Sequence, residues 1–196
     1  MAERRGEIWN QAPKCHRCLG PIVRLLIVTG QRREEVTGLQ WEELDRTERE
    51  WRLPGDRTKN GEPSTVPLND LAIAEPDKVA KGDRWPRRGR VFPTSSGAGF
   101  TAYSKGKNKL DKLIAEDGGD PLPQWRLHDL RRTLATGFQR LGVRFEVTEA
   151  VLNHVGGSRS GVAGIYQHDW REEKREALDI WSGHVSKNLA TADAAG

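Results

Sequence analysis

Apolar residues recur at nearly every fourth position between residues 128 and 141, and this spacing constrains the fold more than any other feature. The residues concerned are Leu130, Leu134, Phe138 and Leu141. They share one face of a helix, and the pattern stops at Gly142, a residue type that commonly ends helices. The spacing predicts an amphipathic helix, and the length of 196 residues predicts one domain.

Similar spacing predicts further helices. They are expected at 22–28, directly after Pro21, at 33–39 with Thr29 as a candidate cap, at 105–115, at 145–152, and from Trp170 onward. The last of these places Ala177, Leu178 and Trp181 on one face. Glycine-rich stretches at 118–121 and 156–158 are expected to interrupt the chain.

Two short segments alternate in the manner of β-strands, 51–54 and 64–68. Between them, Asn60-Gly61 is a dipeptide that accepts the positive φ angles of a tight hairpin turn, which puts Lys59 near the tip. Residues 75–99 are expected to form a loop around a short strand at 91–92, with Pro76 interrupting any helix there. The fold class predicted is α+β, mainly helical, with a small antiparallel β-hairpin or sheet at one edge.

The predicted boundaries are an irregular segment at 1–20, a domain at 21–186 and a flexible tail at 187–196. Lys and Arg number 32 against 28 Asp and Glu, and this net charge of +4 permits a nucleic-acid partner without requiring one. The apolar run at 25–28 is far shorter than the roughly 20 residues of a membrane span. The N-terminus does not read as a secretory signal, so a cytoplasmic location is expected.

The sequence shows few signs of a metal or cofactor site. Cys15 and Cys18 are the only cysteines, and no second Cys or His pair follows at the spacing of a zinc site. We interpret them as two unrelated thiols. No glycine-rich phosphate loop ending in Lys-Ser or Lys-Thr occurs, and no carboxylate cluster of the two-metal type. We expect no cofactor and no metal.

Cationic or imidazole side chains mark four separate elements. They are Arg32 after a Thr-Gly pair, Lys59 at the hairpin tip, His128 with Arg131, and His154 before a glycine break. His128 and Arg131 are three residues apart and therefore share a helix face. Each residue alone is more often structural or solvated, but the set in this order supplies the reagents for one reaction. Tyr166 follows, and Tyr103 is the other tyrosine in the chain.

This order resembles the tyrosine recombinase family, the phage-type integrases. The matching segments are Thr29–Val36, Arg57–Gly61, His128–Thr133, Leu152–His154 and Gly164–Tyr166, within a resemblance that covers about residues 21–185. The segment after Tyr166, Glu172–Trp181, looks like that of prophage integrases.

The resemblance implies roles for six residues. Arg32 and Arg131 would clamp the scissile phosphate, since two guanidinium forks match the charge that develops on its oxygens. Tyr166 would be the nucleophile and needs local activation, because a phenol is almost entirely protonated at neutral pH. His128 would be the general base, Lys59 the general acid, and His154 a hydrogen-bond donor to the phosphate. Glu35, three residues after Arg32, could orient a catalytic cation or brace the fold.

The implied activity is site-specific DNA recombination through a 3′-phosphotyrosyl intermediate, for integration or excision of phage or mobile-element DNA. The implied partners are a double-stranded DNA attachment site and further copies of the chain in a tetramer, with no small-molecule substrate. The implied setting is the bacterial cytoplasm, at the nucleoid when the protein is bound to DNA. Residues 1–20 are too short for the N-terminal DNA-binding domains of such integrases, so a catalytic domain alone is expected.

Two other functions stay open. The chain could be a truncated, non-catalytic DNA-binding remnant or regulator of a prophage integrase, or a relaxing topoisomerase of related chemistry. Four arginines at 84, 87, 88 and 90 suit either a DNA-backbone patch or a solvated loop.

Overall fold

The computed structural model describes residues 5–15, 19–94, 97, 99–117, 122–154 and 170–193. Its α-helices are α1 (Arg5–Gln11), α2 (Leu19–Thr29), α3 (Arg33–Thr37), α4 (Asp70–Ala80), α5 (Tyr103–Glu116), α6 (Leu127–Arg140), α7 (Phe145–Val151) and α8 (Arg171–Asp193). Three short 3-10 helices are η1 (Ala12–Lys14), η2 (Trp41–Glu43) and η3 (Gly55–Arg57). The strands are β1 (Leu44–Asp45), β2 (Glu50–Leu53) and β3 (Ser64–Pro67). The predicted α+β, mainly helical class is confirmed.

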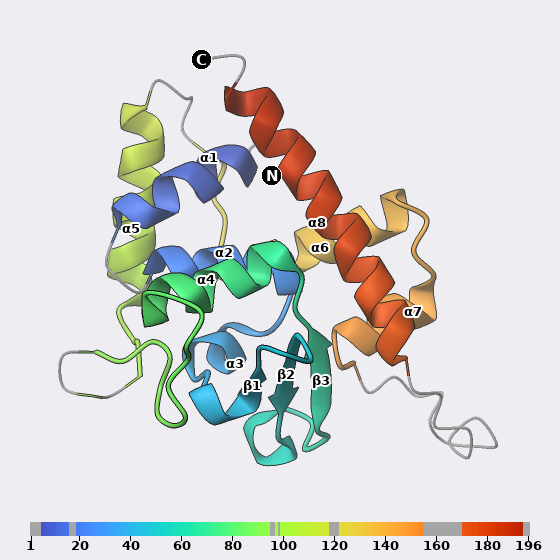
Figure 1. The fold of residues 1–196 in the computed structure, drawn as a ribbon. Helices are drawn as coiled ribbons and strands as arrows, with labels where there is room; N and C mark the ends of the chain where they lie inside the picture. Colours follow the sequence, from blue (N-terminus) through green and yellow to red (C-terminus); the bar gives the residue numbers. More distant parts are fainter. Residues whose placement is uncertain are drawn as a thin grey trace.

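Helix α2 is the centre of the fold, and α4, α6 and α8 all pack against it (Figure 1). Its apolar residues are buried all round, which is the pattern of a helix enclosed by other elements. The helix predicted at 22–28 is therefore confirmed, and it extends to Leu19 and Thr29. Because the first of the predicted site residues follows its C-terminus directly, this buried helix fixes one side of the site.

The three strands form one antiparallel sheet at the edge of the molecule, in the order β1-β2-β3 (Figure 1). In the β2–β3 pair, Trp51 lies opposite Val66, and both are buried while Arg52 between the core positions is exposed. This alternation confirms the predicted hairpin. Its connection is not a two-residue turn, however, because residues 54–63 intervene and include η3.

Helix α4 corrects the prediction that Pro76 ends any helix in this region. Pro76 lies inside α4 and is buried. Asn69 caps the helix by accepting the N–H of Ala72, and Lys81 closes it with a φ of 60°. Packing of Ala72 and Ile73 against the core outweighs the hydrogen bond that proline cannot donate. Residues 91–92, predicted as a strand, form a buried bend between isolated bridges instead.

The predicted irregular segment at 1–20 is also wrong. Residues 5–11 form α1, and Ile8 and Trp9 are buried against α5 and α8. Such a short helix is marginal by itself and is held by packing onto elements far along the chain. At the other end, α8 continues to Asp193, so residues 187–193 are helical rather than a flexible tail. Val185 extends the buried face beyond Trp181, and Leu189 packs partly against the core.

The helices predicted at 105–115, 128–141, 145–152 and from Trp170 are confirmed as α5 to α8. Trp181 of α8 is fully buried, and its indole N–H donates to the carbonyl of Ile27 at 2.8 Å. Helix α8 thereby lies across α2 and α6. Within the part of the chain described, no helix is long and apolar enough to span a bilayer.

Candidate active site

The turn between α2 and α3 presents Arg32. Gly30 adopts a φ of +64°, and a Cβ there would approach the Leu134 side chain to 2.9 Å, so glycine is required by both backbone and space. Thr29 is not the cap predicted, because it is the last residue of α2 and its hydroxyl donates back to the carbonyl of Leu25 at 2.6 Å. Arg32 itself occupies the N-cap position of α3.

Glu35 holds Arg32 at two points. Its Oε2 accepts the Arg32 backbone N–H at 2.8 Å, and its Oε1 lies 2.9 Å from Nη1 of the guanidinium. The first bond satisfies a free N–H at the helix start, and the second orients the arginine side chain. The contact between Glu35 and the Arg32 guanidinium agrees with the prediction that Glu35 orients a cation.

Arg131 of α6 is almost entirely buried, with 5% of its surface exposed. Its Nη1 donates to the carbonyl of Gly30 at 2.8 Å, and its Nη2 donates to the carbonyl of Leu152. Burial, with repulsion from Arg32 second, lowers the pKa of Arg131 to about 10. The group therefore stays protonated at neutral pH, and its two carbonyl bonds use only part of its donor capacity.

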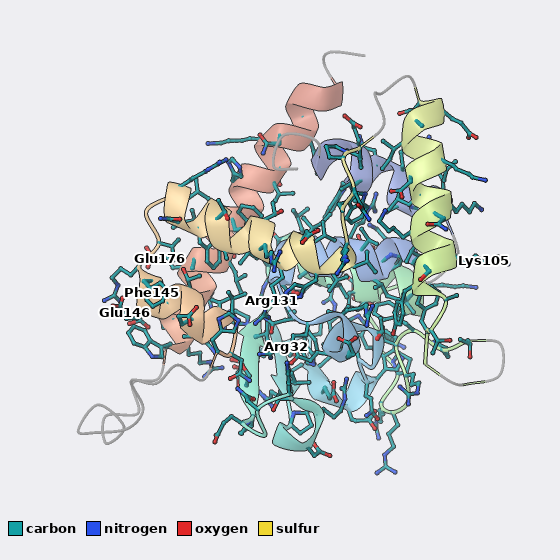
Figure 2. All side chains as sticks on the ribbon, turned by 180° about the vertical axis from the view of Figure 1, so that it is seen from behind. Arg32, Lys105, Arg131, Phe145, Glu146 and Glu176 are labelled. Atoms are coloured by element: carbon teal, nitrogen blue, oxygen red, sulfur yellow. The ribbon has the colours of Figure 1, made fainter. Side chains whose placement is uncertain are left out.

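The end of α7 ties the two arginines together. While Arg131 donates to the carbonyl of Leu152, Nη2 of Arg32 donates to the next carbonyl, that of Asn153, at 3.3 Å. Figure 2 labels both arginines, which lie near each other in the middle of the view. Gln31 adds a third link, since its buried side-chain amide donates to the carbonyl of Val151 at 2.9 Å. Two fixed cations next to each other form a site that favours an anion.

His154 follows this turn and is held by Glu149. Its Nδ1 lies 2.9 Å from Oε1 of Glu149, one turn back on α7. That contact leaves the other ring nitrogen, Nε2, as the one available to a ligand. Sequence reasoning missed Glu149, because a spacing of five residues does not by itself bring two side chains together.

Lys59 lies on the β2–β3 connection, exposed to solvent. The next residue, Asn60, donates through Nδ2 to the carbonyl of Asn153 at 3.0 Å, so the tip of the hairpin touches the turn that binds Arg32. Arg57 fixes the base of the tip by donating to the carbonyl of Glu35 at 3.0 Å and by pairing with Glu43. The contacts of its neighbours Arg57 and Asn60 thus hold Lys59 close to the site. The sequence offered no signal for these long-range contacts.

His128 lies one turn before Arg131 on α6, with an exposed side chain. Partial burial lowers its pKa below the ordinary value, and repulsion from Arg131 and Arg132 lowers it further. These effects favour the neutral form of the His128 ring. A neutral imidazole beside two arginines can accept a proton.

Tyr166 lies outside the described residues, as do His168 and the break expected at 156–158. The flanking elements α7 and α8 contact each other. Tyr103, the other tyrosine, is committed elsewhere: its hydroxyl lies 2.9 Å from Oγ1 of Thr37, and Arg33 stacks over its ring at 4.4 Å. Over the described ranges, no group of three His, Cys, Asp or Glu could hold a metal ion.

Taken together, the central helix, the edge sheet and the paired arginines define the fold of a tyrosine recombinase catalytic domain. The chain belongs to the phage integrase family, whose sequence model matches residues 6–173.

Relatives agree with this family. The chain is 31% identical over 165 residues to the prophage integrase IntA of Escherichia coli strain K12, across 83% of this chain and 37% of that protein. The chain therefore spans about a third of the length of that curated relative.

Solved structures share the fold at low identity. The Tn1549 transposon integrase in complex with transposon right end DNA has a TM-score of 0.64 at 18% identity, over 91% of this chain and 64% of that one. The XerA recombinase has a TM-score of 0.58 at 20% identity, over 93% and 63%. The integrase of mycobacterium phage Brujita has a TM-score of 0.55 at 17% identity, over 92% and 52%.

Proposed function

We propose that this chain catalyses site-specific DNA recombination, cutting and rejoining one strand at a time through a 3′-phosphotyrosyl intermediate. The observation that carries the proposal is the convergence of Arg32 and Arg131 on the turn that ends α7, with His154 next to it. Family membership supports it, and so does the DNA-bound Tn1549 integrase among the similar folds.

The two arginines would bind the non-bridging oxygens of the scissile phosphate. Their fixed positions mean that little reorganisation is needed when negative charge develops in the transition state. The buried contacts of Arg131 and the Glu35 contacts of Arg32 support this role. His154, whose Nδ1–H donates to Glu149, would donate a further hydrogen bond from Nε2 to the same phosphate when its ring carries both protons.

The reaction would proceed by in-line displacement. The phenol oxygen of Tyr166 attacks phosphorus while its proton passes to the neutral imidazole of His128. The bond from phosphorus to the 5′ oxygen breaks, and Lys59 protonates that leaving oxygen. Religation is the reverse reaction with a second 5′ hydroxyl. The phosphotyrosyl ester conserves the energy of the phosphodiester bond that was cut. Religation therefore needs no ATP, metal or other cofactor.

The substrate would be a double-stranded attachment site of a phage or mobile element, synapsed by a tetramer of the chain in the bacterial cytoplasm. The exposed arginines at 84, 87, 88 and 90 suit contacts with the DNA backbone.

A covalent-adduct assay tests this function. The protein is incubated with a pool of nicked suicide duplexes that carry randomised core sequences, so that a cleaved strand cannot be rejoined. The expected product is a protein–DNA species that survives denaturing electrophoresis, forms in the wild type and in Tyr103→Phe, and is absent in Tyr166→Phe. Absence of an adduct in the wild type supports the non-catalytic alternative, and an adduct in Tyr166→Phe refutes the nucleophile. Supercoil relaxation without site dependence would support a topoisomerase.

A further inference from the structure

Asn153, the residue between Leu152 and His154, adopts a left-handed backbone conformation with a φ of 45°. Residues other than glycine avoid this region, although asparagine tolerates it better than most. Glycine would satisfy the backbone at this position at no steric cost. An asparagine at this position therefore suggests that its side chain has a role of its own.

The side chain and carbonyl of Asn153 join two parts of the site. The carbonyl accepts from Nη2 of Arg32 at 3.3 Å and from Nδ2 of Asn60 at 3.0 Å. The side-chain amide donates to Oδ1 of Asn60 at 3.4 Å and to the carbonyl of Glu62 at 3.2 Å. Asn153 is 7% exposed, so these bonds form largely away from water.

The partner, Asn60, directly follows Lys59. The β2–β3 ladder ends at Leu53 and Ser64, so the ladder itself leaves the tip unsupported. Asn60 also accepts the N–H of Glu62 through Oδ1 at 3.2 Å, which shapes the tip locally. The bonds to Asn153 are the ones that connect this tip to the turn binding Arg32.

We propose that Asn60 and Asn153 form a latch that positions Lys59 for protonation of the leaving 5′ oxygen. The latch consists of the bond from the Asn60 amide to the Asn153 carbonyl and the bond from the Asn153 amide to the Asn60 side chain. Both are positioning residues, because neither needs to touch the reacting atoms. This proposal rests on the proposed function and deepens it. Arg32 and the hairpin share one acceptor, the carbonyl of Asn153, so the phosphate clamp and the general acid are held by the same turn.

The latch makes a distinctive chemical prediction. Opening it should remove the acid from the leaving oxygen while the arginines stay in place. A substrate with sulfur in place of the bridging 5′ oxygen releases a thiolate, which is a far weaker base than an alkoxide and leaves without protonation. Latch variants should therefore be slow on the oxygen substrate and fast on the sulfur substrate.

Two variants open the latch, and three others serve as controls. Asn153→Gly keeps the backbone conformation and deletes the two bonds that the Asn153 side-chain amide donates, while the carbonyl at 153 can still accept from Asn60. Asn60→Ala deletes both bonds between the two residues. Both should slow adduct formation about tenfold or more on the oxygen substrate and regain the wild-type rate within about threefold on the sulfur substrate. Lys59→Met should show the same rescue, and Arg131→Met should be slow on both substrates. Glu62→Ala should match the wild type, since only the Glu62 backbone takes part.

Wild-type rates in the latch variants, or a defect that sulfur does not relieve, would overturn the latch. Hydrogen–deuterium exchange in the free protein tests the docking independently of activity. Peptides over 58–63 should exchange faster in Asn153→Gly and Asn60→Ala, with β2 unchanged, and unaltered exchange also overturns the proposal. A wild type that forms no adduct on either substrate refutes the proposed function, and the exchange result then decides whether the latch exists.

Discussion

Both carboxylate oxygens of Glu35 bind Arg32, one at the backbone nitrogen and one at the guanidinium, at 2.8 and 2.9 Å. Glu35 is 2% exposed, so a buried carboxylate orients one of the two arginines of the site. The same residue offers its carbonyl to Arg57, which fixes the base of the hairpin. One residue of a short helix thus connects Arg32 to the loop that carries Lys59.

Replacing Glu35 by glutamine should therefore cost stability as well as activity. The amide can accept only one of the two Arg32 bonds, and it turns an N–H toward the other donor. We expect Glu35→Gln to lower the free energy of unfolding by about 1–3 kcal/mol, measured by urea denaturation. Glu34→Gln is the matched control, since the Glu34 side chain is exposed and pairs with Arg33 at the surface; a change within about 0.5 kcal/mol is expected there. Equal effects of the two variants would contradict the role of Glu35.

His128 should titrate below its ordinary pKa. Partial burial, and after it the charges of Arg131 and Arg132, lower that pKa, so the midpoint of the His128 ring proton shifts by NMR should fall below 6.5. Arg132→Gln should raise the midpoint, and Glu34→Gln should lower it, because the Glu34 charge acts in the opposite direction. A midpoint at or above 6.5 in the free wild type would contradict the lowered pKa of His128.

The same shift has a consequence for stability. Well above pH 6.5 both the folded and the unfolded forms carry a neutral His128, and the group contributes nothing. As the pH falls through 6.5, the unfolded chain binds the proton first, so folded stability decreases until the lower folded pKa is reached. The free energy of unfolding of the wild type, relative to that of His128→Gln, should therefore decrease on acidification in this window. Chemical denaturation at a series of pH values measures it.

Local patterns sufficed for much of the fold. The helices at 105–115 and 128–141 and the paired strands were predictable because their apolar periodicity is contained within each segment. Helix α1 and the helical course of α4 through Pro76 were not, since packing of distant elements stabilises both against weak local preference.

The site, like the fold, was predictable where the pattern is local and not where distant residues meet. Its cationic residues could be found from their order along the chain, and Glu35 from its spacing to Arg32. The contact between Asn60 and Asn153 could not be predicted, because residues 93 positions apart leave no local pattern in the sequence. The prediction of a tight turn at Asn60-Gly61 was wrong for a different reason. The dipeptide permits a turn but does not set the length of the loop around it. Glu149 depends on the precise angle at which α7 ends.

Packing of α6 on α8 should be intolerant of any side chain at Gly137. A Cβ at Gly137 would lie 2.0 Å from Cζ3 of the buried Trp181, so Gly137→Ala should lower the free energy of unfolding by about 1–3 kcal/mol. Gly183 on α8 faces open space, and Gly183→Ala should instead raise it by about 0.5–1 kcal/mol. Urea denaturation of both variants measures the contrast. A neutral Gly137→Ala would mean that α8 can move away from α6.

The Glu149–His154 contact should affect catalysis more than stability. Oε1 of Glu149 holds Nδ1 of His154 at 2.9 Å, and both side chains are partly solvated, so the pair contributes little to folding. We expect Glu149→Ala to slow adduct formation about tenfold by freeing the ring to rotate, with unfolding changed by less than about 0.5 kcal/mol. Glu146→Ala, an exposed change one turn earlier on α7, should leave both quantities unaltered. Since Glu149 acts through His154, Glu149→Ala should add nothing further in a His154→Ala background, whereas independent effects would multiply and contradict this role.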